Sequence, residues 1–396
     1  MSASPVELVD RAEALPELVK RLQGARALAV DIESNGLFAY TARLCTLQIL
    51  DADQTNVIVV DPLRLPDSAL APLAALLGES GPRKLIHDVA FDARILAQHG
   101  LPLGNVFDTA LAARFLGLQA TGLGSLAEAR LGQKLSKKMQ HHDWGRRPLN
   151  REAVEYLAGD VMVMPPLATQ LHAEIEAKSL GLELEEETRY RLASAQRDAG
   201  VADPRPAYVR IRDSEKLPKP ALAVLREVAD VREREAKRLG VPLFKVLDNA
   251  VLIELAKAPP ASKDDLARIR GLQHPRAKVL HGALFEAVER SRNLQDVPVN
   301  ERAEFLTPPP KPPRAELTAM RQREQRLMAW RKAQASARAV DEQAILPGHV
   351  LRRLAEQAPQ STELLAATPG LGGFRATRDG AAILQAIRGP ATSPTP

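Results

Sequence analysis

The stretch ALAVDIE, residues 27–33, decides the fold of the first half of the chain. Four apolar residues run directly into Asp31 and Glu33, which is typical of a buried strand that ends at the edge of a site. Residues i and i+2 of a strand point to the same face, so the two carboxylates can converge. Further apolar runs that predict strands are residues 44–50, 57–60 and 84–87. Because helical spacing alternates with them from residue 68 onward, the sequence indicates an α/β domain.

Two more carboxylates follow in this domain. Asp92 opens a predicted helix just after the strand that ends at His87. Asp160 lies four residues after Tyr156 on a helix that Asn150 is expected to cap, so the phenol and the carboxylate share one helix face. A single acidic residue after a strand is usually a loop or cap residue. The prediction of a site therefore depends on the combination of the four carboxylates with Tyr156.

These side chains predict a divalent metal site. Carboxylate oxygens, in a chain with one cysteine and 8 histidines, favour Mg²⁺ or Mn²⁺ over zinc. Two such ions could bind the attacking and the leaving oxygen of a phosphodiester. Tyr156 would then orient or deprotonate the attacking water. The hypothesis is therefore metal-dependent phosphodiester hydrolysis with Asp31, Glu33, Asp92 and Asp160 as metal ligands.

The second half of the chain is helical and duplicated. At a shift of 99 residues, with no gap, one register holds over some forty positions, which chance does not produce. The matched residues include Val251/Val350, Leu255/Leu354, Ser262/Ser361, Leu266/Leu365, Gly271/Gly370, Arg232/Arg331 and Ala236/Ala335. Between the copies, residues 306–313 (LTPPPKPP) predict a stiff extended linker.

Composition and charge limit the class of protein. Residues 1–200 carry 21 Lys and Arg against 26 Asp and Glu, whereas residues 201–396 carry 33 against 23, which suggests that the second half meets a polyanion. The alternative is ordinary solvated helix surface. The single Cys45 excludes a disulfide framework and a thiolate zinc site. No apolar stretch is long enough to span a bilayer, and the N-terminal segment lacks a signal core, so we expect a cytoplasmic protein without a membrane partner.

The order of the acidic residues resembles the three exonuclease motifs of the DEDD superfamily in its tyrosine-bearing subtype. The flanking sequences narrow this to a resemblance to the ribonuclease D family. The stretches that carry it are RLCTLQI (43–49), KLIHDVAFD (84–92), GLGSLA (122–127), DWGRRPL (143–149) and YLAGDV (156–161). The two repeats resemble helicase-and-RNase-D C-terminal (HRDC) domains, and the second copy carries that family's tryptophan-arginine pair at Trp330 and Arg331.

The resemblance implies an architecture and an activity. It implies an exonuclease domain at 1–205 with a ribonuclease-H-like fold and a mixed sheet, and all-α HRDC domains at 214–294 and 317–392 around a linker at 295–316. It further implies release of nucleotides from single-stranded 3′ ends of RNA, with a role in trimming tRNA precursors and other stable RNAs. We expect a monomer.

RNA contacts are expected around the metal site. The segment 131–150 carries a net charge of +4 and could hold the RNA backbone. The first motif lacks the aromatic or threonine neighbour that the family places after its acids, and Phe38, with Leu37 second, could take that place. The predicted RNA contacts are Leu37, Phe38, His87, Lys137, Lys138, Arg146 and Arg147.

Two alternatives remain open. A 3′→5′ DNA exonuclease would use the same four carboxylates, because sugar choice depends on contacts to the 2′-hydroxyl that the sequence does not locate. An inactive RNA-binding scaffold is a different class of protein, and it would have no use for clustered carboxylates beside a polyanion. The duplicated HRDC domain favours RNA over DNA.

Overall fold

A computed structural model describes residues 5–200, 203–307, 310 and 312–389. The chain forms two compact units. Unit 1 comprises Met1–Ser34, Leu44–Gly200 and Pro312–Pro396, and unit 2 comprises Asn35–Arg43 and Val201–Lys311. The exonuclease part and the second helical copy therefore belong to one unit, and the first copy belongs to the other.

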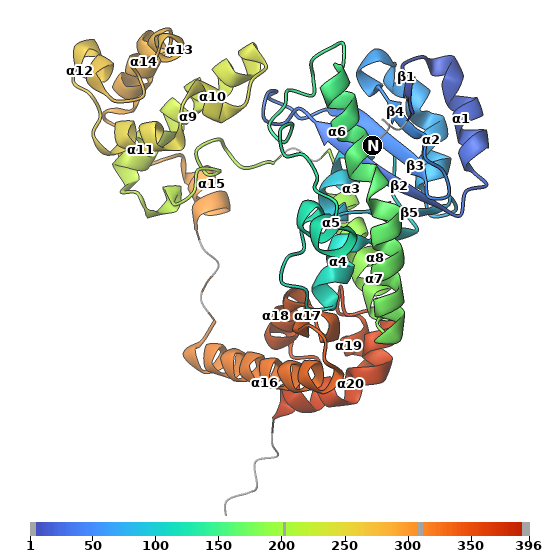
Figure 1. Cartoon of the computed structure of the whole chain (residues 1–396). Coiled ribbons are helices and arrows are strands. Elements are labelled where there is room, and N and C mark those ends of the chain that lie inside the picture. The colour runs from blue at the N-terminus through green and yellow to red at the C-terminus, as the bar shows by residue number, and fades with distance from the viewer. Residues whose placement is uncertain (1–4, 201–202, 308–309, 311, 390–396) are drawn as a thin grey trace, which may run out of the picture. The chain divides into compact units, whose positions relative to one another are not determined.

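Unit 1 is built on a six-stranded mixed sheet with the strand order β1-β4-β3-β2-β5-β6 (Figure 1). Its strands are β1 (Val6–Val9), β2 (Ala27–Ser34), β3 (Leu44–Asp51), β4 (Val57–Val60), β5 (Arg83–Ile86) and β6 (Val106–Asp108). β2 pairs with β3 and β3 with β4 in antiparallel fashion, while the other three pairs are parallel. The predicted mixed α/β fold is confirmed. The edge strands β1 and β6 were not predicted, because Glu7 interrupts the apolar residues of β1 and β6 has only three residues.

Within the described residues, eight α-helices pack around this sheet. They are α1 (Leu15–Leu22), α2 (Ala71–Leu77), α3 (Val89–Gln98), α4 (Thr109–Phe115), α5 (Leu123–Leu131), α6 (Arg151–Met162), α7 (Met164–Ala177) and α8 (Gly181–Arg197). The Asn150 side chain accepts a hydrogen bond from the Ala153 N–H, so the expected cap of α6 is present. Pro165 lies in the first turn of α7, where its missing N–H is tolerated, and the prolines therefore start a new helix.

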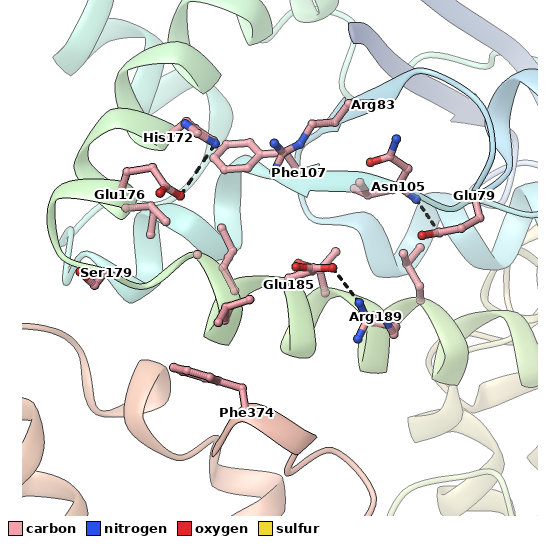
Figure 2. Close-up of a pocket in the computed structure, with 17 residues that line it drawn as sticks. Glu79, Arg83, Asn105, Phe107, His172, Glu176, Ser179, Glu185, Arg189 and Phe374 are labelled. Atoms are coloured by element: carbon pink, nitrogen blue, oxygen red, sulfur yellow. Dashed lines mark hydrogen bonds and ion pairs between the residues drawn. The ribbon is translucent and has the colours of Figure 1, made fainter. Parts of the chain in front are cut away.

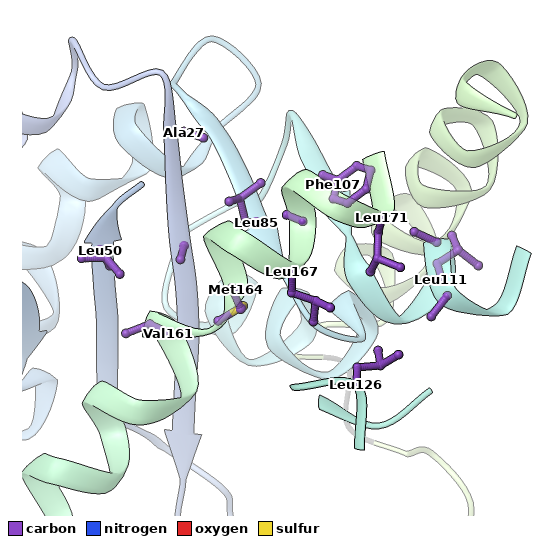
Figure 3. Packing of buried hydrophobic residues seen from close by; sticks show 14 of the residues in the cluster. Ala27, Leu50, Leu85, Phe107, Leu111, Leu126, Val161, Met164, Leu167 and Leu171 are labelled. Carbon is purple, nitrogen blue, oxygen red and sulfur yellow. The ribbon is translucent and has the colours of Figure 1, made fainter. Parts of the chain in front are cut away.

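The core of unit 1 lies between the sheet and helices α4 to α8 (Figure 3). Ala27 and Ala29 of β2 are buried there, among Leu157 and Val161 of α6. Because side chains alternate along a strand, residues 31 and 33 continue the same face as 27 and 29. The alternation thus directs Asp31 and Glu33 toward helix α6, where the core gives way to solvent.

Unit 2 contains the first HRDC copy. Its helices are α9 (Lys219–Leu239), α10 (Leu243–Val246), α11 (Asn249–Lys257), α12 (Lys263–Arg268), α13 (Pro275–Lys278), α14 (His281–Ser291), α15 (Val299–Glu301) and the π-helical turn Arg302–Leu306. The core of this unit extends from Tyr208 to Leu306, beyond the predicted limits of 214 and 294. Arg226 pairs with Glu301 at 2.7 Å, so the first part of the predicted linker packs with the copy. Pro308, Pro309 and Lys311 lie outside the described residues.

The second copy repeats the first. Its helices are α16 (Arg314–Arg338), α17 (Glu342–Ile345), α18 (Gly348–Gln357), α19 (Thr362–Ala366) and α20 (Gly373–Arg388). Helices α17, α18 and α19 begin 99 residues after α10, α11 and α12. Arg232 donates to the Leu247 carbonyl at 3.0 Å, and Arg331 donates to the equivalent Leu346 carbonyl at 3.2 Å. The duplication seen in the sequence is therefore a duplication of structure.

The second copy docks on helix α8 through buried charges. Glu183 is 0% exposed and accepts hydrogen bonds from Arg338, at 2.9 Å, and from Arg378. Burial by itself raises the pKa of Glu183, but the two arginines outweigh it and hold this pKa below its ordinary value. The carboxylate is therefore kept charged by the helical copy.

A second group of contacts lies one helical turn further along α8. The Arg375 guanidinium is 0% exposed; it pairs with Glu186 at 3.3 Å and donates to the Glu183 carbonyl at 3.1 Å. The Phe374 N–H donates to Glu186 at 2.6 Å. Glu187 pairs with Arg191 at 2.8 Å. We call Glu183, Glu186 and Glu187 the docking carboxylates.

None of the helices within the described residues combines the length and the apolar character needed to cross a membrane.

Candidate active site

Three of the four predicted metal ligands meet at one point. Asp31 and Glu33 extend from β2, and Asp160 extends from α6, which crosses β2 and β3. One carboxylate oxygen of each residue lies within 4.8 Å of the others. The i, i+2 spacing on the strand thus places both side chains on one face, as expected from the sequence.

Asp92 lies in the first turn of α3, a helix that contacts β2. Its side chain is 6% exposed, and its Oδ2 atom has no hydrogen-bond partner. A buried carboxylate oxygen without a partner is unfavourable unless something else compensates its charge. We call Asp31, Glu33, Asp92 and Asp160 the acidic cluster.

The acidic cluster is electrostatically frustrated. Burial and then the Asp160 charge raise the pKa of Asp31 to about 7. Burial and then the Asp31 charge raise the pKa of Glu33 to about 9, and burial raises the pKa of Asp160 to about 6. Burial and the neighbouring Asp31 and Glu33 charges also raise the pKa of Asp92 well above its usual range. Among the described residues, no Lys, Arg or His forms an ion pair with any of the four.

This arrangement fits divalent cations. Convergent carboxylates without a basic partner repel one another, and bound cations would remove both the repulsion and the desolvation of the charged forms. The ligand set contains only hard oxygen atoms, which Mg²⁺ and Mn²⁺ prefer. The unpartnered Oδ2 of Asp92 supplies the independent sign that the chain leaves room for such a ligand.

Tyr156 stands beside the cluster on α6, one turn before Asp160. The two side chains form a hydrogen bond, and burial, followed by the Asp160 charge, raises the pKa of the phenol. The Tyr156 ring packs against Trp144, with 5.7 Å between ring centroids, and Trp144 in turn contacts His142. Trp144 is 2% exposed and fixes the back of the Tyr156 ring. The sequence shows Trp144 only as part of the motif 143–149, and nothing in that pattern indicates the contact with Tyr156.

A groove leads away from Tyr156 and Asp160. The groove measures about 350 Å³, and its lining includes Lys134 and Lys138 together with Glu152 and Glu155. Lys134 pairs with Glu128 at 3.3 Å, and Lys138 pairs with Glu152 at 3.9 Å. Arg146 pairs with Asp143 at 3.4 Å, and Lys137 is exposed. The groove therefore carries charges of both signs, and contacts of Lys137, Lys138 and Arg146 with RNA stay predictions.

Arg147 has a different role from the predicted RNA contact. Its guanidinium pairs with Asp61 through two hydrogen bonds of 2.5 and 2.8 Å. It also donates to the carbonyls of Cys45, at 2.6 Å, and Trp144, at 2.8 Å. Asp61 is 1% exposed, so this is an internal clamp that ties the segment before α6 to the sheet. No local pattern indicates the partner, because Asp61 lies 86 residues away in the chain.

Two other predicted RNA contacts also have partners within the protein. The His87 Nδ1 atom lies 2.9 Å from the Thr109 hydroxyl, and burial lowers the pKa of His87. Lys245 lies 3.7 Å from the ring centroid of Phe38, both within unit 2. Leu37 is 47% exposed. One face of Phe38 is covered by Lys245, and contacts of Leu37, Phe38 and His87 with a nucleotide stay predictions.

A larger cavity lies elsewhere. It measures about 610 Å³, and its lining includes Arg83, Phe107, Glu185 and Phe374 but no member of the acidic cluster. Figure 2 shows Phe374 facing helix α8 across this cavity. The cavity thus belongs to the docking region of the second copy, and its size does not identify the active site.

Comparison with known families agrees with this geometry. A family model described as a 3′-5′ exonuclease matches residues 6–176. The HRDC domain model matches residues 221–288 and 320–387, two segments that are again 99 residues apart.

Curated relatives cover most of the chain. Ribonuclease D of Zymomonas mobilis is 31% identical over 299 residues, which are 74% of this chain and 75% of that protein. Ribonuclease D of Gluconacetobacter diazotrophicus is 32% identical over 300 residues, which are 73% of this chain and 72% of that protein.

Solved structures share the whole fold. A protein from Bifidobacterium adolescentis has a TM-score of 0.78 at 20% identity, covering 98% of this chain and 99% of that one. The crystal structure of Escherichia coli RNase D has a TM-score of 0.67 at 23% identity, covering 97% of this chain and 98% of that one. At these identities the likeness is one of fold.

Proposed function

Because the chain belongs to the ribonuclease D family and is a 3′→5′ exoribonuclease, we propose that it hydrolyses RNA with two divalent ions held by the acidic cluster. The products would be nucleoside 5′-monophosphates, released one at a time from a single-stranded 3′ end. The observation that carries the proposal is the convergence of Asp31, Glu33 and Asp160, with the buried Asp92 beside them, where no basic partner lies within the described residues. Mg²⁺ and Mn²⁺ are the ions that suit these ligands.

Two divalent ions, when bound, would lower the pKa of the attacking water and offset the charge on the departing 3′-oxygen. The residues of the chain would do the rest. Asp31, Glu33, Asp92 and Asp160 would hold the ions. The Tyr156 hydroxyl keeps its proton at neutral pH, since its pKa is raised, and it would therefore orient the water as a hydrogen-bond partner.

The substrate would enter along the groove that Tyr156 and Asp160 line. Lys134 and Lys138 would contact the phosphates that precede the scissile bond. We further propose that stable RNAs such as tRNA precursors are the substrates, which the duplicated HRDC domain supports. E. coli RNase D is described as an exoribonuclease involved in structured RNA processing. A monomeric state and a cytoplasmic location stay predictions.

A time course with end-labelled substrates tests the proposal. The protein is incubated with matched RNA and DNA oligomers, labelled at the 3′ or the 5′ end, with EDTA, Mg²⁺ or Mn²⁺. We expect 3′-labelled RNA to release labelled mononucleotide at once and 5′-labelled RNA to shorten stepwise, only with metal. Asp92→Asn is the control for a contaminating nuclease. Preference for DNA, or cleavage in EDTA, would contradict the proposal.

A further inference from the structure

The two HRDC copies contain the same turn, and they use it differently. In copy 1 the turn follows α12, and in copy 2 it follows α19. Ser262 and Ser361 cap these helices in the same way, each accepting a hydrogen bond from the N–H three residues on. Gly271 and Gly370 then occupy the left-handed region with φ of 97° and 88°, where other residues are strained. The backbone course is thus shared, and differences arise from the side chains.

The charge of this turn differs strongly between the copies. Residues 266–285 of copy 1 contain four Arg and Lys residues, two His and no acidic residue. The equivalent residues 365–384 of copy 2 contain Arg375, Arg378 and Asp379. Counterparts at the 99-residue shift are Arg268/Ala367, Arg270/Pro369, Arg276/Arg375 and Lys278/Thr377. Only one of the four basic positions is shared.

That shared position shows what the turn can bind. In copy 2, Arg375 is 0% exposed, because the turn is docked on helix α8 with this guanidinium against Glu186 and the Glu183 carbonyl. The neighbouring Phe374 N–H adds a hydrogen bond to Glu186. Copy 1 has Pro275 at this point, which has no N–H to donate. Copy 2 therefore presents this turn to the Glu186 carboxylate and to a backbone carbonyl of α8.

In copy 1 the same turn is uncovered. Arg270, Arg276 and Lys278 are exposed, and within the described part of the chain none of them forms an ion pair or a side-chain hydrogen bond. Arg268 pairs only with Asp265, its neighbour three residues before, at 3.3 Å. Val279, which follows Lys278, is 75% exposed. Copy 1 thus carries an uncompensated cationic surface where copy 2 carries a docking surface.

We propose that the turn 268–278 of copy 1 contacts the phosphate backbone of the RNA substrate, and that the equivalent turn of copy 2 does not, because helix α8 occupies it. The anionic partner in copy 2 is the Glu186 carboxylate; in copy 1 it is a row of phosphates. An acidic protein would offer similar charge. RNA is the better match, because the enzyme acts on this polyanion and an exposed cationic patch suits phosphates of any sequence. The inference rests on the proposed function only in that RNA is the substrate.

Binding of RNA by the full-length protein in EDTA, where hydrolysis is absent, tests the inference. The probe is a tRNA-sized hairpin RNA with a single-stranded 3′ tail, and affinity is measured over a range of salt concentrations. The patch variant is Arg270→Ala/Arg276→Ala/Lys278→Ala. The matched control removes the same charge from exposed, unpaired positions of copy 2 as Arg321→Ala/Lys332→Ala/Arg352→Ala.

We expect the patch variant to bind more weakly and its slope of log affinity against log salt to be shallower by about 2 to 3, since three phosphate contacts are lost. The control should keep the wild-type slope. Hydrolysis of a short oligomer in Mg²⁺ should be equal in all three proteins, which separates failure of this inference from failure of the proposed function. Equal slopes for patch variant and wild type, or equal losses in patch variant and control, would overturn it.

Discussion

The molecule contains two groups of carboxylates with opposite electrostatic surroundings. In the acidic cluster, burial and like charges raise the pKa of Asp31 and Glu33, and no basic side chain of the described chain pairs with them. Among the docking carboxylates, Glu183 is more deeply buried than Asp31 or Glu33, but Arg338 and Arg378 hold its pKa low. Burial alone therefore does not distinguish a site from a structural contact.

The source of the compensating charge distinguishes them. Where the protein supplies arginines, the carboxylates hold two parts of the fold together, and the charge is satisfied permanently. Where it supplies none, the charge is left for an exchangeable ligand, and the protein is less stable without that ligand. The following predictions test this difference.

The largest effect is expected for Asp92→Asn. Loss of one charged ligand should lower the single-turnover rate by about a thousandfold, the size seen when a key electrostatic contact to a transition state is removed. The same change should leave the metal-free protein at least as stable, because it removes a repelling charge. Rate and urea midpoint are measured on the same preparation. More than a tenth of wild-type turnover would contradict the role of Asp92 as a metal ligand. Clear destabilisation would contradict repulsion within the acidic cluster.

Arg375→Ala should have the opposite signature. It removes a buried cation and leaves Glu186 and the Glu183 carbonyl without their partner, which should destabilise unit 1 by about 3 kcal/mol. The folded fraction should still hydrolyse short RNA. Arg276→Ala is the matched control at the equivalent, exposed position of copy 1, and it should change stability by less than about 0.5 kcal/mol. Equal effects of the two changes in urea unfolding would contradict the docking role.

Tyr156→Phe tests the role of the phenol hydroxyl beside the acidic cluster, where it is a neutral donor to Asp160. If the hydroxyl orients the water, the single-turnover rate should fall by about 10²-fold while RNA affinity barely changes. Trp144 and the ring packing are unaffected by the change, so thermal stability should stay close to wild type. Weakened binding with an unchanged rate would make Tyr156 a substrate contact instead.

The smallest effect concerns the pH dependence of stability without metal. The pKa values of Asp31, Glu33 and Asp160 are raised in the folded state to about 7, 9 and 6, so the folded protein binds protons more tightly than the unfolded chain. Their contribution is complete below the ordinary carboxyl pKa and is lost as the pH rises through these values.

In EDTA the urea midpoint should therefore fall between about pH 5 and 9 for these groups, and the fall should be weaker in Asp31→Asn/Asp160→Asn. Glu183 has a lowered pKa, so its contribution is instead lost as the pH drops to acid values. Mg²⁺ should reduce the alkaline loss, because it binds only the folded site. A midpoint that rises steadily from pH 5 to 9 in EDTA would show that the cluster is not under electrostatic strain.

The sequence predicted most of what forms the candidate site. The strand at 27–33 and the spacing of Tyr156 and Asp160 are local patterns with a period of two or about four, and such patterns translate directly into faces of strands and helices. The duplication could also be predicted, because a single shift of 99 residues aligns the two copies. Edge strand β6, with three residues, is too short for its pattern to be seen.

What the sequence did not predict depends on partners far apart in the chain. Arg147 was expected to contact RNA, since it lies in a basic segment, but its partner Asp61 is 86 residues away. The acidic residues 183–187 could be read as solvated helix surface, because Arg338 and Arg378 come 155 and 195 residues later. Charge patterns predict a sign of surface potential, but they do not say which surfaces are covered.

The order of the units along the chain has a consequence for synthesis on the ribosome. Helix α8 is made long before its arginine partners: Glu183 and Arg338 are separated by 155 residues, which at ordinary translation rates is a delay on the order of ten seconds. During that interval Glu183 and Glu186 of the nascent exonuclease domain lack their arginine partners, and the side of helix α8 that Phe374 later faces is uncovered. Polypeptides released early, after the first copy, would hold all four metal ligands but lack the module that covers this helix. Such fragments would expose helix α8, because the second copy covers a surface of a domain that is translated before it.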